Sequence, residues 1–191
     1  MRTNTQQFAT SAPVDDPENY FGFAQNWVNM VQLHHDLEEA VQFPGWNPPL
    51  DMSQNEAEHR ELMVPLSAFG NYLAEVKAGV EPWSATKAEA LAEAFLPVLM
   101  HHLVAELDTL APEKIKASGL TEEKLKATHE NMAALARTKV DVNKDIPAML
   151  LHNDGDLEWP PTPWTRTPDF KMPRELYEHH KGWWKYAAVQ L

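Results

Sequence analysis

The feature that most constrains the fold is a helical period of apolar residues in three long segments. In residues 17–43, 54–76 and 85–110, apolar side chains recur every three or four positions, as in helices that bury one face. A shorter segment at 122–139 has the same character. No run shows the strict alternation of a half-buried strand, and short connections favour antiparallel neighbouring helices. The sequence therefore predicts an all-α, up-down helix bundle.

Three parts are expected along the chain. Residues 1–16 are polar and predict a flexible lead, and residues 17–140 contain the helical segments. Residues 141–191 are rich in Pro and Trp, lack a clear period and end in a short helical stretch at 174–187. Because tryptophan side chains bury large apolar areas, we expect this C-terminal extension to pack on the bundle.

Composition and charge argue against several classes of function. The chain has no cysteine, which rules out disulfides, thiolate metal sites and a cysteine nucleophile. Its net charge of −12 is unfavourable for binding nucleic acid or an anionic membrane surface. The sequence shows neither an apolar run of about 18 residues, which a membrane span needs, nor a secretory signal, so a cytoplasmic protein is expected. Motifs for phosphate binding or Ser–His–Asp catalysis are also lacking.

Each of the three long stripes carries polar residues at one end. On the helical period, these inward-facing residues are His34, Glu38, His59, His102 and Glu106. His35 and Glu39 lie on a neighbouring, more polar stripe, so we expect them to face water. In an up-down-up arrangement the five inward residues lie within about 12 Å of the same end of the bundle. They are therefore predicted to converge on one layer.

Such a layer has two interpretations. Carboxylates are costly in an apolar core unless they are compensated. Imidazole and carboxylate ligands together suit iron, manganese or zinc, so the layer is a candidate metal site. Alternatively, His34 and His102 are protonated and form ion pairs with Glu38 and Glu106 in a half-buried polar layer. The spacing alone leaves both interpretations open.

Three motifs resemble a known family. "HHDLEEAVQFP", "EAEHREL" and "LPVLMHHLVAEL", in this order, resemble the hemerythrin-like (HHE cation-binding) domain in the form common in fungi. The later "IPAMLLHND", "WPPTPW" and "HKGWWKY" resemble the C-terminal extension of those fungal proteins. The resemblance implies an up-down four-helix bundle that holds non-haem iron, often a di-iron centre. It implies metal ligation by the same five residues: His34, Glu38, His59, His102 and Glu106.

The chain departs from the family pattern in two places. The family has a further helix that supplies another histidine, whereas no histidine precedes His34 here. The family also often has a His-xxx-His pair on the second long helix, where this chain has Asn55 one turn before His59. A missing helix would expose an apolar groove, which helix 122–139, the C-terminal extension or a second subunit in a homodimer would cover. His129 is a weaker candidate for the replacement ligand than for a surface residue.

Two functions follow from these observations. The first is a hemerythrin-like protein whose iron, mono- or dinuclear, binds dioxygen or nitric oxide or is handled as cargo. The alternative is a degenerate member without metal that acts as a helical binding or interaction protein. Because the sequence indicates no organic substrate pocket, both are favoured over an iron-dependent oxidoreductase.

Overall fold

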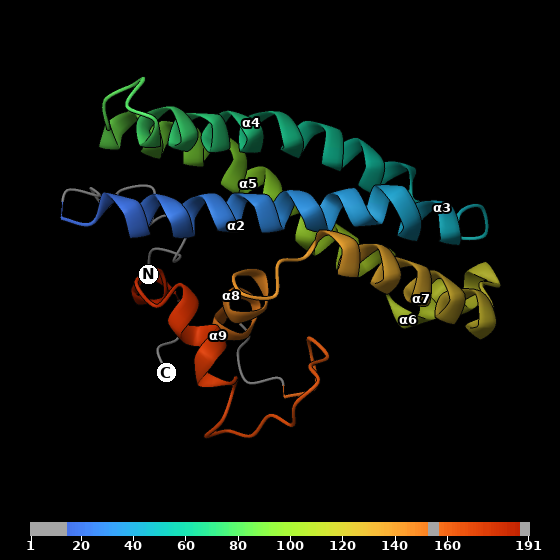
Figure 1. The fold of residues 1–191 in the computed structure, drawn as a ribbon. Helices are drawn as coiled ribbons and strands as arrows, with labels where there is room; N and C mark the ends of the chain where they lie inside the picture. Colours follow the sequence, from blue (N-terminus) through green and yellow to red (C-terminus); the bar gives the residue numbers. More distant parts are fainter. Residues whose placement is uncertain (1–14, 153–156, 188–191) are drawn as a thin grey trace.

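The computed structural model describes residues 15–152 and 157–187, and within these ranges the protein is helical (Figure 1). The only β feature in the described residues is an isolated bridge between Thr167 and Phe170. This confirms the predicted all-α class. The helices are α2 (Pro17–Leu37), η1 (Glu38–Gln42), α3 (Phe43–Trp46), α4 (Ser53–Lys77), α5 (Ala85–Thr109), α6 (Pro112–Ser118), α7 (Glu122–Lys139), α8 (Asp145–His152), α9 (Arg174–His179) and η2 (Trp184–Tyr186).

The three long helices α2, α4 and α5 run up, down and up beside one another (Figure 1). Local chemistry sets the start of two helices: Ser84 Oγ accepts from the Lys87 backbone N–H before α5, and Thr121 Oγ1 accepts from the Lys124 N–H before α7. The inward faces of the long helices share one apolar core, which includes Val28 of α2, Leu66 of α4 and Phe95 of α5. Packing in this core sets how far each of the three helices is shifted along the bundle axis relative to the others.

The end of α2 continues into a π-helical segment, η1, and then into the short α3. A π-helical turn carries one more residue than an α-helical turn, so it rotates the following side chains relative to the α-helical period. Phe43, the first residue of α3, is fully buried, and its ring stacks on that of His59 at 5.0 Å between centroids. Isolated π-helical turns are frequent at functional sites, and η1 begins at the predicted ligand Glu38.

The fourth side of the bundle is built from two separate pieces (Figure 1). α7 packs against η1 and α3 at one end of α2, whereas α8 and η2 pack against the rest of α2. Leu151 of α8 and Trp184 of η2 are fully buried in the core of the long helices. The sequence did not predict α6 or α8, and it predicted one helix at 174–187 where α9 and η2 lie. The division at residue 140 stays a prediction.

The C-terminal segment fits closely against the start of α2. A Cβ atom added to Gly22 would lie 2.5 Å from the Trp183 ring. In a helix, alanine is more favourable than glycine by about 1 kcal/mol. Gly22→Ala is nevertheless expected to lower the free energy of unfolding by about 1–3 kcal/mol, because the Trp183 indole must move to make room for the Cβ atom. Denaturant melts measure this. In a Trp183→Ala background the same substitution should be neutral or stabilising; equal losses in both backgrounds would contradict the contact.

α5 has an apolar outer face as well as an apolar inner one. Among the described helices, α5 alone is long and apolar enough to cross a membrane. This is weak evidence for a membrane span, because core helices of soluble proteins have the same length and composition. Met100, Val104 and Leu107 are exposed on this helix at a spacing that places them on one side. The homodimer that was expected to cover the groove of the missing helix stays a prediction.

Candidate metal centre

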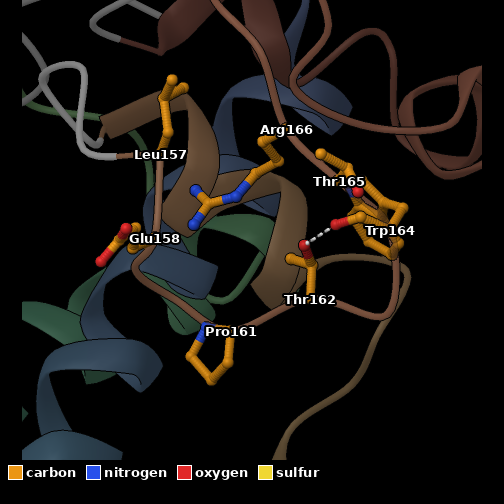
Figure 2. Close-up of a pocket in the computed structure, with 7 residues that line it drawn as sticks. All are labelled: Leu157, Glu158, Pro161, Thr162, Trp164, Thr165 and Arg166. Carbon is orange, nitrogen blue, oxygen red and sulfur yellow. Dashed lines mark hydrogen bonds between the residues drawn. The ribbon is translucent and has the colours of Figure 1, made fainter.

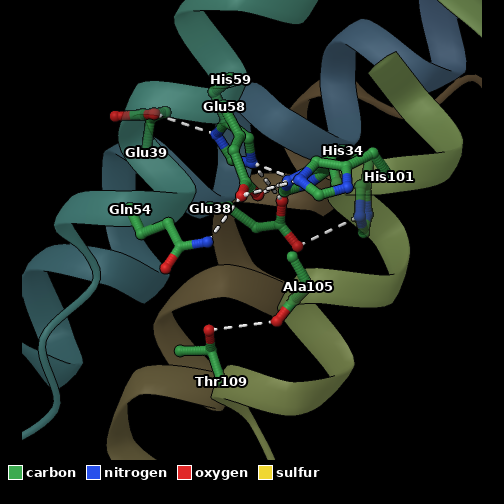
Figure 3. Close-up of polar contacts among 10 residues, drawn as sticks. His34, Glu38, Glu39, Gln54, Glu58, His59, His101, Ala105 and Thr109 are labelled. Atoms are coloured by element: carbon green, nitrogen blue, oxygen red, sulfur yellow. Dashed lines mark hydrogen bonds and ion pairs between the residues drawn. The ribbon is translucent and has the colours of Figure 1, made fainter. Parts of the chain in front are cut away.

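The five predicted site residues gather between α2, η1, α4 and α5 in two adjoining groups, and Figure 3 shows polar contacts of His34, Glu38 and His59 among them. Together with His35, which was not among the five, they offer ligand atoms in two groups that share Glu38, and within each group these atoms lie within 4.8 Å of one another. The imidazole-rich group consists of His35, Glu38, His59 and His102, all buried. The carboxylate-rich group consists of His34, Glu38 and Glu106. A buried set of His and Glu residues that could hold a metal ion is therefore present.

The three imidazoles of the first group form a triangle. Ring centroids lie 4.5 Å apart for His35 and His59, 4.5 Å for His59 and His102, and 5.1 Å for His35 and His102. The Nε2 atoms of His59 and His102 are 3.1 Å apart. The Nε2 atom of His35 is buried and has no hydrogen-bond partner among the described residues. The Nε2 atoms, which are the inner nitrogens of the three rings, thus face one another and accept no hydrogen bond from, and donate none to, an oxygen of the described residues.

The outer nitrogen of each ring has an acceptor. Nδ1 of His35 is 2.6 Å from the backbone oxygen of Val31, which can only accept a hydrogen bond. Nδ1 of His59 is 2.9 Å from Glu39 Oε1 (Figure 3). Nδ1 of His102 is 3.1 Å from Glu58 Oε2. A carbonyl or carboxylate at Nδ1 fixes the proton there and leaves the Nε2 lone pair free.

Burial favours the neutral form of two of these rings, those of His35 and His59. It lowers the pKa of His59 to about 3, with neighbouring imidazoles contributing, and it also lowers the pKa of His35. If the contacts at Nδ1 hold the ring protons of His59 and His102 there, two Nε2 lone pairs face each other at 3.1 Å. Either a proton or a cation must lie between such nitrogens. The arrangement is that of histidines that bind a metal through Nε2 and are oriented through Nδ1.

Glu38 links the two groups. Its Oε1 is 3.1 Å from Nε2 of His34, and its Oε2 is 3.6 Å from Nε2 of His59. Burial raises the pKa of Glu38 to about 9, and the nearby Glu106 carboxylate adds to the shift. Burial also raises the pKa of Glu106. Without a cation, the Glu38 carboxyl group therefore retains its proton at neutral pH.

The donor set fits a metal ion better than a set of ion pairs. Glu38 Oε2 and Glu106 Oε1 are buried and, like His35 Nε2, have no hydrogen-bond partner among the described residues. Unpaired buried polar atoms are costly, and a bound cation would satisfy all three. The ion-pair alternative places His34 beside Glu38, and this contact is present at 3.1 Å. It leaves the inner nitrogens of the three buried imidazoles without an acceptor, however, whereas a cation would bind their lone pairs. A mixture of imidazole and carboxylate ligands suits iron, manganese or zinc.

The structure corrects one expectation. His35, predicted to face water, is 1% exposed, whereas the predicted inward residue His34 has 49% of its side chain exposed. The buried line on α2 follows a seven-residue repeat through Phe21, Val28 and His35, because the helix packs against neighbours on two sides. His34 remains in the carboxylate-rich group through its contact with Glu38.

Two further residues were missed or misjudged. Glu58 was not singled out, yet it is buried and contacts His102 across the α4–α5 interface. Glu39 is partly exposed, as expected, but its carboxylate also contacts His59. Both precede or follow a predicted ligand by one residue, and that adjacency was the available signal. His129 is exposed on α7 and belongs to neither group, so His35 rather than His129 adds the extra imidazole.

A separate surface pocket lies in the C-terminal extension (Figure 2). Its volume is about 430 Å³, and Trp164, Thr162 and Arg166 are among its lining residues. The guanidinium of Arg166 donates to the backbone oxygens of Trp159 and Pro160 at 2.9 Å each. These bonds hold the irregular extension together, and no lining residue belongs to either metal-ligand group.

Comparison of the chain with protein-family models, with curated proteins and with solved structures gives no match.

Proposed function

We propose that this chain is a hemerythrin-like metal-binding protein that holds non-haem iron, as one or two ions, between α2, α4 and α5. The proposal combines the motif resemblance with the buried His and Glu groups. We place the protein in the cytoplasm and expect dioxygen or nitric oxide as its small ligand, or iron itself as its cargo.

The observation that carries the proposal is the pair of facing imidazole nitrogens. His59 and His102 approach through Nε2 at 3.1 Å while Nδ1 of each contacts a carboxylate. The Nδ1 contacts alone would also suit an ion-paired polar layer. Such a layer would, however, direct Nε2 of each ring at an acceptor as well, rather than at the Nε2 of another imidazole. The convergence of a third inner nitrogen, from His35, supports a cation at this point.

The residues divide into holding and orienting roles. His35, His59, His102 and Glu38 would hold a metal ion, while Glu39 and Glu58 fix the ring orientations through Nδ1. Glu38 is placed to contact both groups, and half-exposed His34 marks the side of the site nearest solvent. Bound iron would supply a Lewis-acidic redox centre with coordination positions for a small molecule.

Metal content tests the proposal most simply. The full chain, purified without a histidine tag, would be loaded anaerobically with ferrous iron, desalted and measured by elemental mass spectrometry. We expect about one or two iron ions per chain, and chelation should lower the melting temperature, since the ligands converge only in the folded state. No retained iron together with a melting curve insensitive to chelator would contradict it and favour the metal-free binding protein.

The orienting role of Glu58 gives a separate prediction. Glu58→Gln should weaken iron binding by about 10–100-fold, because an amide at this position no longer holds the Nδ1 proton of His102 as a carboxylate does. Competition with a chromogenic chelator measures the affinity. Glu61→Gln, which removes an exposed carboxylate from the same helix, is the matched control. If Glu58→Gln and Glu61→Gln bind iron with equal affinity, the orienting role assigned to Glu58 is wrong.

A further inference from the structure

Asn55 is a buried polar residue that the two ligand groups leave unexplained. It lies in α4, one turn before His59, and is fully buried. Neither its Oδ1 nor its Nδ2 has a hydrogen-bond partner among the described residues. An amide with both atoms buried and unpaired destabilises the fold, so a role in binding would account for it.

The packing of α4 and α5 places Asn55 level with Glu106. His59 and His102 meet across this antiparallel pair. Asn55 lies one turn before His59 on α4, and Glu106 lies one turn after His102 on α5, so both steps lead in the same direction. Residues four apart share a helix face. Asn55 therefore belongs to the layer of the carboxylate-rich group.

The two layers differ in chemical character. The imidazole-rich group offers three ring nitrogens and Glu38, whereas the other group offers oxygens of Glu38 and Glu106 with the single imidazole of His34. The amide oxygen of Asn55 would add a further hard ligand to the second layer. Nitrogen-rich sites suit zinc and iron, and oxygen-rich sites suit manganese.

We propose that Asn55, Glu38, Glu106 and His34 form a second cation position, rich in oxygen, that accepts Mn²⁺ while the imidazole-rich position holds Zn²⁺ or Fe²⁺. The inference rests on the proposed function, because Glu38 is shared with the first position. Asn55 is the metal ligand that gives the second position its preference for a harder ion.

Sequential loading tests this on the full, metal-free chain. One equivalent of Zn²⁺ is added first, and Mn²⁺ is then titrated while the electron paramagnetic resonance signal of free Mn²⁺ is followed. We expect about one Zn²⁺ and one Mn²⁺ bound per chain. Zn²⁺ binding without any Mn²⁺ binding would overturn the inference and leave the proposed function standing. Binding of neither ion would overturn both.

Substitutions at position 55 separate a ligand from a packing residue. Asn55→Leu should weaken Mn²⁺ binding by at least about 10-fold, leave Zn²⁺ binding unchanged and raise the melting temperature of the metal-free protein, since the unpaired amide is gone. Asn55→Asp should retain Mn²⁺ binding. A purely structural asparagine would instead lose melting temperature in Asn55→Leu with Mn²⁺ binding intact, and that result would overturn the inference.

The control for Asn55→Leu is Asn71→Leu, at an exposed asparagine on the same helix. It should change neither Mn²⁺ binding nor Zn²⁺ binding. A loss of Mn²⁺ binding in both leucine variants would show that the effect does not come from position 55, and it would also overturn the inference.

Discussion

Replacing His102 by alanine is expected to abolish iron binding and, with it, the stabilisation that iron gives. A ligand that binds only the folded state stabilises it by about 4 kcal/mol at 1,000 times its dissociation constant. His102 is fully buried and its Nε2 faces that of His59, so its loss opens the imidazole-rich group. Elemental analysis and melting curves with and without chelator measure the effect.

The neighbouring His101 provides the matched control. Its side chain is 74% exposed and its Nε2 is 3.8 Å from Glu58, outside both ligand groups. His101→Ala should bind iron as the original chain does and should lose melting temperature when chelator is added. The chelator should leave the melting curve of His102→Ala unmoved. If both variants bind the same amount of iron, the assignment of His102 as a ligand is wrong.

The second large effect concerns Glu38 and pH in the metal-free protein. The folded state retains the Glu38 proton up to about pH 9, because burial raises the pKa of this carboxyl group. The unfolded chain releases it near the ordinary glutamate pKa of about 4.3, so between these values the unfolded state binds fewer protons. The free energy of unfolding therefore falls as pH rises, by up to about 1.4 kcal/mol per pH unit.

Glu38→Gln removes this titration and isolates its effect. In chelator, the variant and the original chain should have similar stability near pH 5, and the variant should be more stable by a few kcal/mol at pH 8. The same variant should fail to retain iron, since an amide cannot supply the carboxylate that both groups share. Denaturant melts at the two pH values measure the difference; parallel pH profiles would contradict a protonated, buried Glu38.

The inward residues of α4 and α5 could be predicted from sequence because their apolar stripes are regular. His59, His102 and Glu106 continue the lines of Leu66 and Phe95 and are buried as expected. Their level in the bundle followed from helix rise and short connections. The regular geometry of the antiparallel helices α4 and α5 was therefore enough to predict the positions of these three site residues.

Which histidine of α2 faces the site could not be predicted in the same way. Aromatic residues on α2 are distributed over two adjacent stripes, so the helical period alone did not separate His34 from His35. Packing against two neighbours selected the line through Val28 and His35. The π-helical turn at Glu38 has no recognised sequence signature, yet it lies where Glu38 and Glu39 approach the centre.

The C-terminal extension was predicted in character but not in detail. Its tryptophans were expected to pack on the bundle, and Trp184 is fully buried there. The helix α8 was missed because its sequence is short and contains Pro147.

The central claim is that iron lies among the inner nitrogens of His35, His59 and His102. Anomalous diffraction at the iron edge, from crystals of the iron-loaded chain, tests it most directly. We expect an iron peak at coordinating distance from these three nitrogens and from the Glu38 carboxylate. A peak only at exposed histidines such as His101, or no peak despite iron loading, would contradict the claim.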